Sequence, residues 1–81
     1  MNITIKQWLK VGRKYAIKEK VCDEDGMWRV KVLIVRLEGM YPHLAAFRDG
    51  RGLMRTYKYW DIKQMMRERK FMEVPEDEQT D

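Results

Sequence analysis

The clearest alternation of hydrophobic and polar positions lies in the middle of the chain, over Trp28–Leu37 (WRVKVLIVRL). Valine, isoleucine and leucine dominate this segment, and a run of this composition predicts a β-strand. Because side chains alternate across a strand, one side carries Val30, Val32 and Ile34 and the other carries Arg29 and Lys31. The segment is long for a strand in a small sheet, so we expect it to bend near Glu38-Gly39.

Three further segments have the pattern of half-buried strands, and turn residues separate them. They are Lys14–Val21, His43–Arg48 and Leu53–Tyr59. The acidic stretch Cys22–Gly26 predicts the first turn, and Tyr41-Pro42 closes the long central strand because proline cannot donate to a ladder. Asp49-Gly50 predicts a type I′ hairpin turn. The spacing therefore indicates consecutive antiparallel strands.

Helix signals bracket these strands. Thr4 and Gln7 have the spacing of a capping box, which predicts a short helix over residues 5–11 that Gly12 ends. After the last strand, Asp61 is the predicted N-cap of a second helix, with Gln64 at the capping-box position. The apolar face of that helix consists of Ile62, Met65 and Met66.

This order of elements predicts a mainly β domain. Four or five short antiparallel strands, one of them long and bent, favour a small Src-homology-3-like barrel, because closure hides strand edges that a short chain cannot cover. The alternative is an α+β sheet with a helix packed on one face. A length of 81 residues leaves room for one domain only.

Residues 35–62 (VRLEGMYPHLAAFRDGRGLMRTYKYWDI) also carry a family resemblance. The segment resembles a loose group of short uncharacterised proteins carried by phages and integrative elements of Gram-positive bacteria. The shared pattern corresponds here to Val35, Tyr41-Pro42, Leu44–Phe47, Gly50/Gly52, Tyr57–Tyr59 and Asp61-Ile62. These are mostly structural positions in about a third of the chain, so the resemblance implies a small-barrel fold and a mobile-element origin but no known activity.

Charge is unevenly distributed along the chain. Residues 1–71 contain all 17 lysines and arginines and 8 of the 13 acidic residues, which gives +9, whereas residues 72–81 carry −5. The last segment contains Pro75 and few apolar residues, so we expect a single domain over 1–71 and an acidic disordered tail over 72–81. Deleting Met72–Asp81 would then leave the melting temperature nearly unchanged.

The residues that could carry catalysis are few. The chain contains no serine, one histidine (His43) and one cysteine (Cys22), and the acidic neighbours of Cys22 would raise its thiol pKa. We therefore expect no enzyme activity, no metal site and no cofactor. The longest apolar run is Val32–Val35, so no membrane span is expected. With no signal peptide and no second cysteine, the cytoplasm is the expected compartment.

A binding role fits this composition better than catalysis. A sequence pI of about 9.3 favours nucleic-acid contact, with DNA or RNA held by cations and stacked on tyrosines. The predicted contact residues are Arg29, Lys31, Arg48, Arg51, Arg55, Tyr57 and Tyr59. The alternative is a protein-interaction module, such as an inhibitor or adaptor of a host defence protein, because small barrels bind through aromatic grooves or sheet edges. The chain would be a monomer or a homodimer paired through an edge strand.

Overall fold

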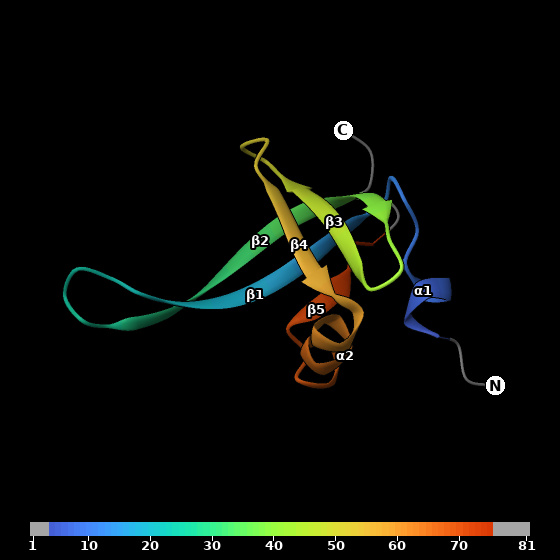
Figure 1. Cartoon of the computed structure of the whole chain (residues 1–81). Helices are drawn as coiled ribbons and strands as arrows, with labels where there is room; N and C mark the ends of the chain where they lie inside the picture. Colours follow the sequence, from blue (N-terminus) through green and yellow to red (C-terminus); the bar gives the residue numbers. More distant parts are fainter. Residues whose placement is uncertain (1–3, 76–81) are drawn as a thin grey trace.

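The computed structural model describes residues 4–75 and shows a five-stranded antiparallel sheet with two short helices. Figure 1 shows the elements in chain order: α1 Ile5–Trp8, β1 Lys14–Cys22, β2 Trp28–Met40, β3 Leu44–Asp49, β4 Met54–Lys58, α2 Tyr59–Arg67 and β5 Phe71–Glu73. The strands lie in the order β4-β3-β2-β1-β5. The predicted mainly β class is confirmed, whereas closure into a Src-homology-3-like barrel is not confirmed, because the described ladder ends at β4 and β5.

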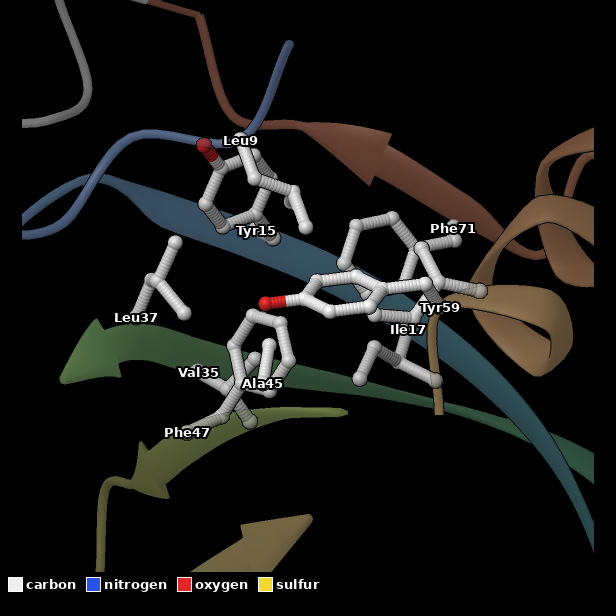
Figure 2. Packing of buried hydrophobic residues seen from close by; sticks show 10 residues of the cluster. Leu9, Tyr15, Ile17, Val35, Leu37, Ala45, Phe47, Tyr59 and Phe71 are labelled. Atoms are coloured by element: carbon white, nitrogen blue, oxygen red, sulfur yellow. The ribbon is translucent and has the colours of Figure 1, made fainter. Parts of the chain in front are cut away.

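One face of the sheet, called the inner face, carries the core. Tyr15 and Phe47 come from β1 and β3, and Phe71 from β5 lies against both rings at centroid distances of 5.5 and 5.7 Å. Both helices pack on this face, with Ile62 of α2 fully buried. In Figure 2 the labelled side chains of β1, β2, β3 and β5 converge with that of Tyr59 from α2. Four aromatic rings, those of Tyr15, Phe47, Tyr59 and Phe71, thus lie among the ten buried residues of a core that is small because the chain is short.

The long central strand bends where the sequence predicts it. The pairing of β2 with β3 changes register between Leu37 and Gly39, which is the signature of a β-bulge. A side chain at Gly39 would approach the Tyr41 hydroxyl at 3.3 Å, so this close approach suits glycine. The bulge lies beyond the pairing of β2 with β1, which ends at Arg36.

The two helices differ from their predicted bounds. The capping box of Thr4 and Gln7 is present, but α1 ends at Trp8 because Leu9 is already extended. Helix α2 starts at Tyr59, with Lys58 as its N-cap, so the predicted cap at Asp61 is wrong. The reason is that β4 runs directly into α2, which places Asp61 in the first turn of the helix.

The C-terminal boundary is also corrected. Strand β5 pairs with residues Tyr15–Ile17 of β1, and Val74 after it is buried. Met72, Glu73 and Val74 therefore belong to the domain, and a tail that begins at residue 72 is wrong. The rest of the predicted tail, from residue 76 onward, lies outside the described residues.

The turn between β3 and β4 is not the predicted type I′ turn. Positive φ falls on Gly52 (82°) and not on Gly50, and Asp49 and Leu53 close a three-residue loop through the Asp49 N–H. A left-handed glycine at the end of such a loop forms a bulge that matches the twist of the strands. The hairpin itself is confirmed.

Candidate interaction surface

The hairpin of β1 and β2 extends well beyond the rest of the sheet. Strand β3 pairs with β2 only from Val35 onward, and β5 pairs with β1 only over Tyr15–Ile17. The nine pairs from Lys14↔Arg36 to Cys22↔Trp28 nevertheless continue without a register shift. Residues 18–32 thus form a two-stranded projection, here called the arm, which leaves the body in Figure 1 as a long twisted ribbon.

The face of the sheet opposite the core, called the outer face, carries a line of exposed apolar residues along β2. This apolar row consists of Trp28, Val30, Val32 and Ile34, with exposed fractions of 69, 62, 53 and 46%. Scattered exposed apolar residues are ordinary, but four in succession on one strand face form a continuous patch. The predicted alternation is confirmed, and the side that carries the valines is exposed along its whole length, whereas the other side is exposed at Arg29 and Lys31 and buried at Val35.

Cations border the apolar row. Lys18 and Lys20 lie directly across from Val32 and Val30 on β1. Where the row ends on β2, Lys14, Arg36 and Arg48 lie side by side on three neighbouring strands. Among the described residues, Glu38 accepts a hydrogen bond from Arg48 at 2.9 Å, and Glu68 lines a depression beside the row with Lys18, Lys20 and Val30. The outer face therefore combines an apolar centre with a rim in which cations outnumber carboxylates.

The tip of the arm is acidic and locally ordered. One carboxylate oxygen of Asp23 accepts hydrogen bonds from the N–H groups of Asp25 (3.1 Å) and Met27 (2.9 Å). Its other oxygen pairs with Arg29 at 2.8 Å. With Glu24 and Asp25 also at the tip, the end of the arm repels polyanions.

The two tyrosines predicted to stack on nucleic-acid bases face the interior. Tyr59 is 8% exposed at the start of α2, and its hydroxyl donates to the Tyr41 carbonyl at 2.6 Å. Tyr57 is half-buried on the inner face, edge-on to Phe47 at 5.8 Å. Stacking on Tyr59 is therefore wrong, because the residue is part of the core.

The five predicted cationic contacts divide between the two faces. Arg29 and Lys31 lie on the inner side of the arm, and Arg48 lies on the outer face. Arg55 is engaged by Glu19 at 3.1 Å and by Asp49 at 3.5 Å. Lys31, Arg51 and Arg55 do line one shallow depression beside the β3–β4 turn. The structure thus brings together three of the seven predicted residues, and no single face presents them all.

Asp49 is the buried acidic residue of the body. Its carboxylate accepts hydrogen bonds from the N–H groups of Leu53 (3.0 Å) and Arg51 (2.9 Å) and contacts Arg55. The Leu53 hydrogen bond, helped by that of Arg51 and by the Arg55 guanidinium, outweighs burial and lowers the pKa of Asp49 below its usual value. This carboxylate holds the β3–β4 turn and is not presented to a partner.

The residues examined for catalysis are dispersed. Cys22 is exposed at the end of β1, and His43 is exposed before β3. Within residues 4–75, no cluster of histidine, cysteine and carboxylate side chains could hold a metal ion. Over the same residues, no helix is long and apolar enough to cross a membrane.

Sequence reasoning did not identify the apolar row as a surface. The signal is present in Val32–Val35, where apolar residues occupy both sides of the strand. Only one side can face a core in a two-layer domain, so such a run predicts either burial on both faces or an exposed apolar face. Comparison of the chain with protein-family models, curated proteins and solved structures gave no significant match.

Proposed function

We propose that this chain is a protein-binding module without enzymatic activity, and that its contact surface is the apolar row of β2 with the basic border around it. The observation that carries the proposal is the exposure of Trp28, Val30, Val32 and Ile34 along the arm and at its base, because none of these residues belongs to the core. An isolated two-stranded hairpin is marginally stable in water. A partner that covers this face would bury apolar area that folding leaves exposed.

The border defines the kind of partner. Lysines on β1 flank the apolar row, and three further cations lie at the end of the row near the body. A complementary surface would therefore carry carboxylates around an apolar centre. Tryptophan is enriched among residues that dominate binding energy, so Trp28 is the expected anchor. An inhibitor or adaptor that targets an acidic face of a host protein would use such a surface.

A matched pair of tryptophan variants tests this proposal. Trp28 on the arm and Trp60 on α2 are exposed to similar extents, 69 and 63%. Immobilised wild-type protein, Trp28→Ala and Trp60→Ala are compared for proteins retained from a cell lysate, with quantification by mass spectrometry. We expect an acidic partner that wild type and Trp60→Ala retain and that Trp28→Ala loses. Equal retention by both variants would refute the proposed surface.

Nucleic-acid binding is the second candidate, and the line of Lys14, Arg36 and Arg48 across the outer face favours it. Fluorescence anisotropy with labelled single- and double-stranded DNA and RNA, from about 50 to 300 mM salt, separates the two proposals. Micromolar binding that falls steeply with salt and is indifferent to Trp28→Ala would favour nucleic acid. The buried Tyr59, which cannot stack on a base, argues for the protein partner.

We also propose that the fold is a Src-homology-3-like barrel. Two features support it: β5 returns to pair with β1, and Arg55 of β4 reaches Glu19 of β1 across the inner face. The second feature requires strong curvature of the sheet, because β3 and β2 lie between β4 and β1. The resemblance of residues 35–62 to small proteins of mobile elements would make a host protein the natural partner.

A further inference from the structure

The arm has an open backbone edge as well as an apolar face. Residues Trp28–Ile34 of β2 pair with β1 on one side, and within residues 4–75 no strand pairs with their other side. Strand β3 occupies that side only from Val35, which faces Asp49 at the β3–β4 turn. An additional strand beside Trp28–Ile34 would therefore lie in line with β3.

The backbone groups on this edge can be assigned from the hydrogen-bond pattern. Leu37 donates to Arg13 and accepts from Gly12, both just before β1, and the Met27 carbonyl accepts from Asp23. Since hydrogen-bonding direction alternates along an antiparallel strand, odd-numbered residues of β2 point to β1 and even-numbered ones point away. The unpaired groups thus belong to Trp28, Val30, Val32 and Ile34, the same residues that form the apolar row.

Two depressions mark the point where β3 ends. One of about 330 Å³ has Ile34, Arg36 and Arg48 in its lining, and one of about 350 Å³ has Lys31, Arg51 and Arg55. Ile34, Asp49 and Gly50 line both. A chain entering the open position would pass between them, with cations on either side.

We propose that the edge Trp28–Ile34 takes up an extended segment of a partner protein as an additional strand, and that this segment alternates apolar and acidic residues. The inference rests on the proposed function and specifies its binding mode. Side chains opposite Val30 and Val32 would lie on the outer face beside the apolar row. Side chains opposite Arg29 and Lys31 would lie on the inner side, where carboxylates would meet Lys31 and compete with Asp23 for Arg29.

A second copy of the chain fits this edge less well. When the edge pairs with itself over its full length, Lys31 lies opposite the Lys31 of the other copy, and like charges directly opposed destabilise a sheet. An acidic segment removes this conflict.

The test uses the full chain and a fluorescent peptide, as long as the edge, in which valine and glutamate alternate. The control peptide replaces each glutamate with lysine. We expect the glutamate peptide to bind at least about tenfold more tightly. In hydrogen exchange followed by NMR, the amides of Val30, Val32 and Ile34 become protected on binding, whereas those of Lys31 and Leu33, already bonded to β1, change little.

Proline variants on opposite edges of the arm provide the matched control. Val30→Pro removes an outward N–H, and Lys20→Pro removes the N–H directly across the arm, which points to the other edge. We expect Val30→Pro to weaken peptide binding about tenfold and Lys20→Pro less than about threefold, with both variants checked for folding by circular dichroism.

The outcomes separate the two proposals. Peptide binding without protection of the Val30 and Val32 amides would overturn strand addition while leaving face-to-face docking on the apolar row. Equal affinity for the glutamate and lysine peptides would overturn the acidic alternating segment. If Trp28→Ala still loses a partner that Trp60→Ala retains, the proposed function stands although the binding mode is wrong.

Discussion

The β1–β2 hairpin and the β3–β4 hairpin have turns of the same kind, but the first turn lies at the tip of the arm and the second lies in the body. In each, an aspartate accepts hydrogen bonds from the N–H groups two and four residues ahead, a left-handed glycine follows at the third position, and an arginine at the sixth contacts the carboxylate. The residues are Asp23, Gly26 and Arg29 in the arm and Asp49, Gly52 and Arg55 in the body.

The two turns differ in how deeply their aspartates are buried. The Asp49 side chain is 4% exposed and Asp23 is 25% exposed. Local sequence is therefore sufficient to form the turn, and packing against the core decides whether the hairpin adds to stability. Because the arm keeps its apolar residues in solvent, we interpret it as the part of the molecule that serves binding.

The largest difference in the free energy of unfolding is expected between substitution of an aromatic residue in the body and substitution of one in the arm. Phe71→Ala removes a ring that contacts Tyr15 and Phe47, and should lower the free energy of unfolding by about 3–5 kcal/mol. Trp28→Ala on the arm should change it by less than about 0.5 kcal/mol. Urea denaturation measures both, and similar losses would show that the arm is part of the folding unit.

A truncation tests whether β5 belongs to the body. Deleting Met72–Asp81 removes two residues of β5 and buried Val74, so we expect a loss of about 2 kcal/mol, or a fall of about 10 °C in melting temperature. A second truncation that removes only residues 76–81 is the control. Equal melting temperatures for the two truncated proteins would contradict the role given to β5.

The two turn aspartates should differ in pH dependence. Since the folded-state pKa of Asp49 is lowered, its carboxylate stabilises the fold above its ordinary pKa of 3.8, and this contribution is lost as pH falls through the folded-state value. Asp49→Asn should therefore melt at a lower temperature than wild type at pH 7, and the difference in melting temperature should narrow as the pH falls below 3.8.

The matched variant is Asp23→Asn in the arm. Its melting temperature should stay close to that of wild type at every pH, because opening the arm exposes little of the core. If the melting-temperature difference between Asp49→Asn and wild type stays constant with pH, the stabilisation does not come from the ionised Asp49 carboxylate.

The sequence predicts correctly those features that depend on interactions between residues close together in the chain. The capping box of Thr4 and Gln7, the bend of β2 and the hairpin at Asp49 follow from short-range chemistry, and the structure confirms them. The sequence does not predict strand β5, because three residues are too few to show a period. The sequence pattern extends the preceding strand to Tyr59, because β4 passes into α2 without a break or a capping side chain.

The candidate site was harder to predict than the fold. Val32–Val35 is apolar on both sides, so periodicity could not decide which side faces the core. That choice depends on where the helices and β5 pack, which is a property of the whole domain. The cationic residues were recognised from the sequence, whereas their division between two faces depends on strand register.

The most direct measurement of the central claim compares one substitution at two positions of β2. Val32 is 53% exposed in the apolar row and Val35 is 1% exposed in the core. Threonine keeps the shape and the strand preference of valine, so only burial differs. We expect Val35→Thr to cost about 1–3 kcal/mol and Val32→Thr less than about 0.5 kcal/mol in urea denaturation. Equal losses would show that the apolar row is covered in the folded protein and is not a surface held open for a partner.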